Sequence, residues 1–293
     1  MADCTSSQCS SCAAADGCQD KDRIAKLERN TGGVHHMFGV VGGKGGVGKS
    51  LITSLLAIQT QKMGYKTAVL DADITGPSIP RIFGVHAYAG VEDDTLLPHV
   101  TSSGTKIMSL NMLLENETDP VFWRGPVISN VMQQLWEETK WGEINYMFVD
   151  MPPGTGDVPL TVFQSLPVEG IIIATTPQSL VSMIVQKAVN MAEKMDIPIL
   201  GMVENMQYIV CPDCGKKISL FGSDESVDAS DVPVLERLPL DPALSTACDN
   251  GTLASLDVPY LAQTAKLLTE SFLPNEYMER KSNDTQNDTQ DNT

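Results

Sequence analysis

Apolar residues fall along the chain in short continuous runs that alternate with stretches of helical spacing. The apolar runs predict buried strands, which are Met37–Gly42, Lys66–Asp71, Ile144–Asp150, Gly170–Thr175, Pro198–Glu204 and Val232–Leu238. The amphipathic stretches predict helices over Lys49–Met63, Val127–Thr139 and about Leu180–Met195, with two more near the end of the domain. Short strands are expected near Thr95–Leu97 and Lys106–Leu110. Strands that alternate with helices predict an α/β fold with a doubly wound, mostly parallel sheet.

Polar ends flank this patterned region. Residues 1–30 form a polar, cysteine-rich arm, and residues 275–293 form a low-complexity tail that we expect to be disordered. Residues 31–274 are predicted to make one domain, with an insertion at 206–222 that carries a Cys-x2-Cys pair. The pattern therefore predicts three segments, of which the central one is folded.

Composition narrows the class of partner. The 293 residues carry a formal net charge of -17 and a sequence pI near 4.5, which argues against nucleic acid as the main partner. No apolar run reaches the ~18 residues that span a membrane, and the N-terminus has no apolar signal segment. We therefore expect a cytoplasmic protein. Seven cysteines in a reducing compartment favour metal or redox use over disulfides.

A glycine-rich loop follows the first predicted strand and precedes the first predicted helix. Its spacing fits Gly-x4-Gly-Lys-Ser, the phosphate-binding loop of nucleotide triphosphatases. Lys49 supplies a cation near the β- and γ-phosphates, and Ser50 offers a hydroxyl to Mg²⁺. An ordinary glycine-rich turn would not need Lys49 followed by Ser50. The residues expected to bind ATP here are Gly43, Lys44, Gly45, Gly46, Val47, Gly48, Lys49, Ser50 and Leu51.

Carboxylates at the ends of other predicted strands complete this site. Asp150 closes an apolar strand and is expected to hold Mg²⁺ directly or through water. Asp73 is the better candidate for orienting the attacking water, whereas Asp71 is the one expected to cap a turn. Because the carboxyl ends of parallel strands meet at one edge of a sheet, these residues and Asn205 should gather there.

Two groups of cysteines suggest metal binding. Cys211 and Cys214 can grip one metal centre, and two such pairs across a symmetric dimer would fill four positions. A bridging zinc ion or a reduced pair that stabilises a turn are the alternatives. The second group could wrap a complete cluster within one chain, with zinc or a mobile thiol arm as alternatives; it consists of Cys4, Cys9, Cys12 and Cys18. Cys248 stands alone and is interpreted as a packing residue.

The additional Lys44 makes the loop resemble the deviant Walker A motif of the MinD/ParA/nitrogenase-iron-protein class of dimeric ATPases. Within that class the chain resembles the Mrp/ApbC iron–sulfur cluster carriers from about Met37 to Leu268. The segments that carry this resemblance are Asp71–Ser78, Trp123–Pro126, Asp150–Asp157, Val203–Met206 and Cys211–Cys214. The cysteine-rich arm resembles the extension of eukaryotic cytosolic scaffold members in its Cys9-x2-Cys12-x5-Cys18 part, although the first gap is shorter.

The resemblance implies specific roles. Lys44 would reach the partner subunit's nucleotide across a homodimer, and Asn205 would contact adenine with Pro239 nearby. Cys211 and Cys214 from each subunit would bridge one [4Fe–4S] cluster. The implied activity is that of a slow ATP hydrolase that carries the cluster to apo-proteins, without nucleic acid or membrane as a partner.

Two other functions compete with this one. A MinD/ParA-like positioning ATPase with a structural zinc site would share the loop, but we expect neither a basic surface for DNA nor a carboxy-terminal amphipathic membrane helix. An electron donor like the nitrogenase iron protein would need a stable cluster rather than a transferable one.

Overall fold

The computed structural model describes residues 33–73, 76, 78–86, 88–93, 95–114, 125–177, 181–220 and 232–273. The predicted arm 1–30, with its four cysteines, and the predicted tail 275–293 lie outside these residues.

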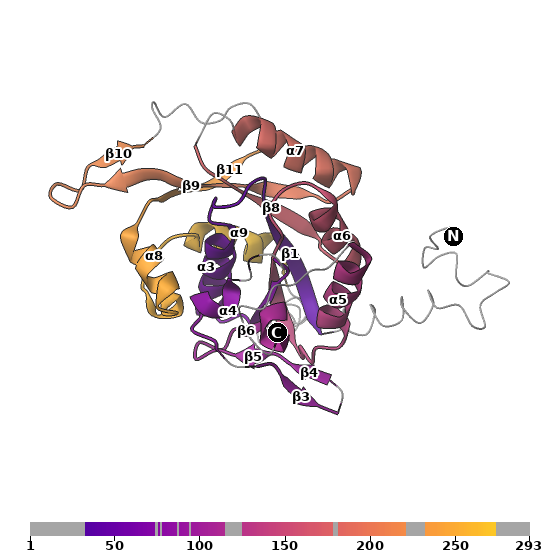
Figure 1. Cartoon of the computed structure of the whole chain (residues 1–293). Helices are drawn as coiled ribbons and strands as arrows, with labels where there is room; N and C mark the ends of the chain where they lie inside the picture. The colour runs from indigo at the N-terminus through magenta and orange to yellow at the C-terminus, as the bar shows by residue number, and fades with distance from the viewer. Residues whose placement is uncertain are drawn as a thin grey trace, which may run out of the picture.

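A nine-stranded sheet runs through the centre of the described part (Figure 1). Its path is β10-β9-β8-β1-β7-β2-β6-β5, and β11 also pairs with β9. The edge strands β5 and β10 pair antiparallel, whereas the other pairings are parallel. The strand bounds are β1 Val34–Gly42, β2 Thr67–Asp71, β5 His99–Val100, β6 Lys106–Ser109, β7 Ile144–Asp150, β8 Gly170–Thr175, β9 Ile199–Val210, β10 Lys217–Ser219 and β11 Val234–Pro239. A separate antiparallel hairpin joins β3 Gly90–Glu92 to β4 Thr95–Leu97.

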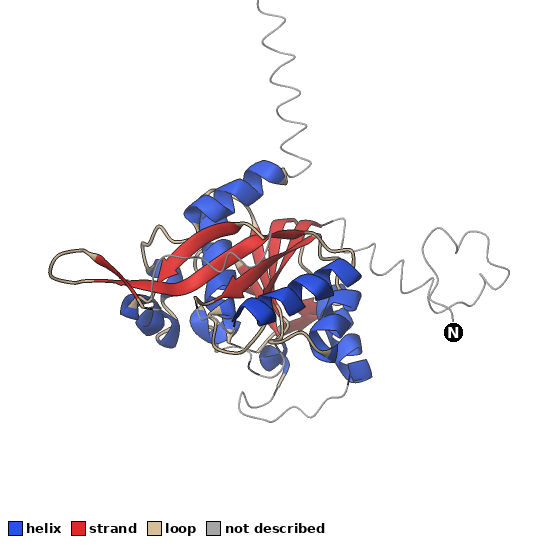
Figure 2. Ribbon diagram, turned by 90° about the horizontal axis from the view of Figure 1, so that it is seen from above, coloured by secondary structure: helices blue, strands red, loops and turns tan. Residues whose placement is uncertain are grey.

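Helices cover both faces of this sheet (Figure 2). The helix bounds are α3 Lys49–Lys62, α4 Ile79–Ile82, α5 Gly125–Glu137, α6 Asp157–Ser165, α7 Val181–Lys194, α8 Pro242–Asp249 and α9 Ala262–Ser271, with 3₁₀ turns η1 Leu110–Leu113 and η2 Leu253–Ser255. One core cluster holds side chains of α3, α4, α8 and α9, and the other holds side chains of α5, α6 and α7. Alternate residues of β1 enter the two clusters: Phe38 and Val40 pack on the α3 side, Met37 and Val41 on the α6 side. Burial on both faces explains the continuous apolar runs.

The doubly wound, mostly parallel fold is therefore confirmed. Several bounds differ from the sequence prediction. Helix α6 was not predicted, and β1 begins at Val34 rather than Met37. Strand β9 continues past Glu204 to Val210, so the expected insertion begins inside the strand. The extension was missed because Glu204, Asn205 and Gln207 are buried although they are polar.

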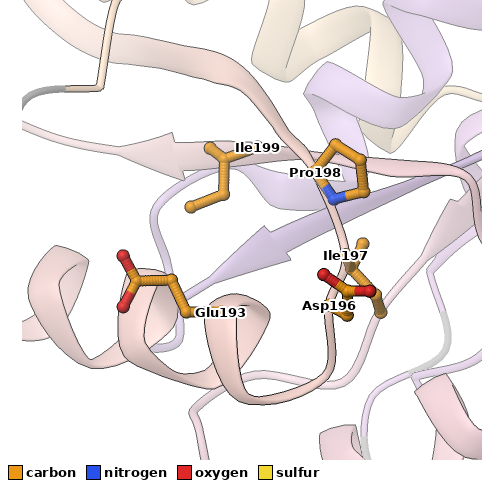
Figure 3. A pocket seen from close by; sticks show the side chains of 5 residues that line it. All are labelled: Glu193, Asp196, Ile197, Pro198 and Ile199. Atoms are coloured by element: carbon orange, nitrogen blue, oxygen red, sulfur yellow. The ribbon is translucent and has the colours of Figure 1, made fainter.

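A surface pocket lies where α7 is followed by β9 (Figure 3). Its lining residues are Glu193, Asp196, Ile197, Pro198 and Ile199. The pocket adjoins the amino end of β9, whereas the glycine-rich loop follows the carboxyl end of β1. The pocket is therefore separate from the predicted nucleotide site. Within the described residues, no helix is long and apolar enough to span a lipid bilayer.

Candidate nucleotide site and cysteine hairpin

The glycine-rich loop connects β1 to α3 and depends on two glycines in the left-handed region. Gly46 has φ 80° and Gly48 has φ 86°, values that residues with a Cβ rarely adopt. A Cβ at Gly48 would also lie 2.1 Å from Nδ2 of Asn205. The loop leads into the amino end of α3, where free N–H groups and the helix dipole favour an anion.

Lys49 is the first residue of α3 and is buried between two carboxylates. Its Nζ lies 2.8 Å from Oδ1 of Asp150 and 3.3 Å from Oδ2 of Asp73. Burial acts to lower the pKa of Lys49, but Asp150 and Asp73 outweigh it, so that the pKa is raised. Lys49 therefore stays a cation at the position where phosphate oxygens are expected.

Asp150 ends β7 and is fully buried. Ser50 Oγ donates to its Oδ2 at 2.5 Å, and Thr53 Oγ1 donates to its Oδ1 at 3.3 Å. Burial raises the pKa of Asp150, while Lys49 and Ser50 act against that shift. A hydroxyl and a carboxylate side by side are the oxygen donors that Mg²⁺ prefers, so this pair fits the predicted magnesium site.

Asp71 and Asp73 take different positions although both lie at the end of β2. The Asp71 carboxylate accepts hydrogen bonds from the backbone amides of Asp73, Ser78 and Ile79 at 3.1, 3.1 and 3.2 Å. It also accepts one from Ser109 Oγ at 3.2 Å. Burial raises the pKa of Asp71 to about 8, and the nearby Asp150 adds to the shift. Asp71 therefore binds the amides at the start of α4, whereas Asp73 faces Lys49.

Lys44 is half-buried in the same loop. Asn205, on β9, lies against the other side of the loop and donates from Nδ2 to the Val47 carbonyl at 3.0 Å. Pro239 ends β11 and pairs with Tyr208 of β9. Of the predicted nucleotide residues, Asp73, Asp150 and Asn205 thus contact the segment from Val47 to Ser50, whereas Pro239 lies beside β9.

Two residues of this site were missed by the sequence prediction. Thr53 lies one helical turn after Lys49, and its hydroxyl reaches the same carboxylate. The spacing of four residues on a predicted helix was the available signal. Ser109 ends β6 and binds Asp71; only the pairing of β6 with β2 brings the two together, and no local pattern reports it.

Cys211 and Cys214 lie on the turn between β9 and β10, and Figure 1 shows this hairpin projecting from the body of the molecule. The Cys211 amide donates to the Lys216 carbonyl at 3.0 Å, and the Gly215 amide donates to the Cys211 carbonyl at 2.9 Å. Hydrogen bonds from the backbone amides of Cys214 and Asp213 lower the pKa of the Cys211 thiol. A thiolate held in this way suits a metal or cluster ligand.

The hairpin gives two thiols on one turn. Cys211 is half-buried and Cys214 is exposed. Among the residues that the structure describes, no group of three or more His, Cys, Asp or Glu side chains could hold a metal ion. A centre with four thiolates therefore needs ligands from outside the described part of this chain. Cys248, on α8, is different, because burial raises the pKa of its thiol to about 11.

Comparison with known proteins gives a consistent family. The model of the ParA family, described as NUBPL iron-transfer P-loop NTPase, matches residues 33–271. The iron-sulfur cluster carrier protein of Clostridium perfringens is 44% identical over 262 residues, which cover 83% of this chain and 92% of that protein. Its namesake in Methanocaldococcus jannaschii is 40% identical over 261 residues, covering 86% and 90%.

Solved structures agree with this result. A nucleotide-binding protein from Archaeoglobus fulgidus, solved with ADP, has a TM-score of 0.71 at 36% identity, covering 82% of this chain and 94% of that one. The septum site-determining protein MinD of Pyrococcus horikoshii, solved with Mg-ADP, has a TM-score of 0.58 at 20% identity, covering 80% and 95%, and shares the fold. The chain therefore belongs to the ParA/NUBPL family of iron-transfer P-loop NTPases.

Proposed function

We propose that this protein is an ATP-dependent carrier that holds a [4Fe–4S] cluster between two copies of the chain and transfers it to apo-proteins. The observation that carries the proposal is the projecting hairpin, which offers two thiols on the turn that follows β9, the strand in contact with the nucleotide loop. The names of the curated relatives support the same role.

Nucleotide binding falls to the loop and its carboxylates. Asp150 and Asp73 keep Lys49 charged before ATP binds. When ATP binds, Lys49 would contact the β- and γ-phosphates in place of these two carboxylates. Ser50 and Asp150 would hold Mg²⁺, which neutralises developing charge on the phosphates when it is bound. Asp73 would orient the attacking water, and Asn205 and Pro239 would meet the adenine end.

Hydrolysis would depend on a second subunit. Lys44 would contribute its charge to the partner subunit's nucleotide, an arrangement in which the transition state is stabilised only when two chains close. Two hairpins would then face one another, and their four thiolates would complete the coordination of one cluster. Closure of the dimer would thus control both the chemistry and the cargo.

A cluster that is to be transferred needs ligands that an acceptor protein can reach. Because Cys214 is exposed and Cys211 is half-buried, a cluster held there could be reached by an acceptor protein. The clients would be apo iron–sulfur proteins. The amino-terminal Cys4, Cys9, Cys12 and Cys18 would supply a second cluster site, which the proposal does not need for transfer.

Cluster transfer is the direct test. The protein is purified without oxygen, reconstituted with iron and sulfide, and mixed with an apo-[4Fe–4S] enzyme whose activity reports transfer. We expect transfer by the wild type and by Cys4→Ala and Cys248→Ala, and none by Cys211→Ala or Cys214→Ala. A colourless protein that retains one zinc ion per dimer would instead favour a positioning ATPase with a structural zinc site.

A further inference from the structure

Strand β9 contacts the nucleotide loop through Asn205 and leads into the cysteine hairpin. The strand is irregular between these two points. On β11, Arg237 pairs with Glu204 of β9, and Pro239 pairs with Tyr208. One residue of β11 therefore lies opposite three of β9, residues 205–207. This is a bulge, a feature that bends a strand and redirects the residues after it.

The centre of the bulge has an unfavourable backbone conformation. Met206 has φ 58°, in the left-handed region that side chains with a Cβ rarely occupy. Its amide donates to Oδ1 of Asn205 at 3.0 Å. The conformation therefore persists only with support from its surroundings, and the Asn205 side chain provides one such support.

The same amide side chain is bound to the nucleotide loop. Nδ2 of Asn205 donates to the Val47 carbonyl at 3.0 Å and packs so closely on Gly48 that a Cβ there could not fit. Asn205 is 1% exposed, so water does not replace either bond at low cost. One end of this side chain thus contacts the loop, and the other end holds the bulge.

Strand β11 pairs with β9 on both sides of the bulge, but the other neighbours of the two segments differ. Residues 199–204 pair with β8 inside the sheet. Residues 208–210 pair with β10, and the Tyr208 carbonyl accepts from the Leu240 amide at 2.8 Å. Cys211 follows directly. A change in the backbone at Met206 would therefore move the hairpin together with the end of β11, at Pro239 and Leu240, relative to residues 199–204.

We propose that Asn205 and Met206 form a hinge through which the state of the nucleotide loop sets the position of Cys211 and Cys214. A nucleotide that reshapes residues 47–48 shifts the acceptor of Asn205, changes the support of Met206, and lets the hairpin take a second orientation. The ligand acts because its loop makes different contacts in the two states. That the hinge would act on a bound cluster rests on the proposed carrier function, whereas the movement of the hairpin with nucleotide does not.

Thiol reactivity in the cluster-free protein tests the hinge. The reduced full-length chain is treated with iodoacetamide with and without MgADP, and modification of Cys211 and Cys214 is quantified by peptide mass spectrometry. In the wild type we expect MgADP to change the rate on the order of fivefold. Met206→Gly, which accepts positive φ without strain, should lose this response while ADP still binds, and Asn205→Ala should lose it as well.

The matched control is Asn190→Ala, the same substitution at an exposed position of α7, which should respond like the wild type. If Asn205→Ala no longer binds ADP, Met206→Gly carries the comparison. Unchanged reactivity in the wild type with ADP bound, or a full response in Met206→Gly, would overturn the hinge. Neither result bears on cluster transfer, which is measured separately, so that failure of the hinge and failure of the carrier function are distinguishable.

Discussion

Two carboxylates that are two residues apart do different work in this protein. Asp71 accepts hydrogen bonds from three backbone amides and the Ser109 hydroxyl, whereas Asp73 lies 3.3 Å from Lys49. The sequence places both at the end of the same strand and supports only the expectation that one of them caps a turn. The two carboxylates differ because the amides of Ser78 and Ile79, at the start of α4, donate to Asp71, whereas Asp73 faces Lys49.

Substitution of these two residues should therefore affect different properties of the protein. Asp73→Asn should remove most ATP hydrolysis and cost less stability than the same change at Asp71, because Lys49 keeps its ion pair with Asp150. Asp71→Asn should lower the free energy of unfolding by about 1–3 kcal/mol, because both oxygens of Asp71 accept hydrogen bonds and Asn replaces one of them by an NH2 donor. Steady-state ATPase assays and urea denaturation measure the two effects. Equal loss of stability in both variants would contradict the division of roles.

Lys44 gives a second prediction at the residue scale. Lys44→Ala should lower hydrolysis by roughly 10³-fold while ADP still binds, if its charge acts on the transition state in the partner's site. Lys62→Ala, in the last turn of α3, is the control and should hydrolyse normally. An ATPase rate that survives Lys44→Ala would exclude the trans role.

At the scale of elements, apolar runs predicted the central strands well because helices bury both sheet faces. The same reasoning failed where buried residues are polar. Strand β9 continues through Glu204, Asn205 and Gln207, and Glu204 is paired with Arg237 at 2.7 Å. These side chains are buried by contacts with distant segments, which hydrophobic periodicity does not report. The bulge that supports the hinge therefore could not be foreseen from the sequence.

The loop between β1 and α3 supplies a prediction for an element. Gly48→Ala should cost about 1–2 kcal/mol from the left-handed backbone alone and should push Asn205 away, because the new Cβ would lie 2.1 Å from its Nδ2. Thermal unfolding and fluorescent-nucleotide binding should both be impaired. Gly64→Ala, just after α3, is the matched control, since Gly64 also has a positive φ of 92° but a Cβ there meets nothing within 4 Å, so nucleotide binding should be kept. Similar nucleotide binding by the two variants would contradict this description of the loop.

At the scale of the whole molecule, the proposed function requires two chains. The nucleotide loop follows β1 and the cysteine hairpin follows β9, and both strands belong to the same sheet. The resemblance stated from the sequence correctly indicated the family, which the match over residues 33–271 confirms. The dimer and its shared cluster remain proposals, because the described residues of a single chain supply two projecting thiols and the phosphate loop of one subunit.

The stoichiometry of the reconstituted protein tests this central proposal most directly. The variant should lack the four amino-terminal cysteines, so that iron bound by the arm does not enter the count. Iron and sulfide analysis combined with light scattering should give one [4Fe–4S] cluster per two chains. The Cys211→Ala change should remove both the iron and the sulfide. One complete cluster per monomer, or a dimer that binds zinc but no iron, would contradict a cluster shared between two hairpins.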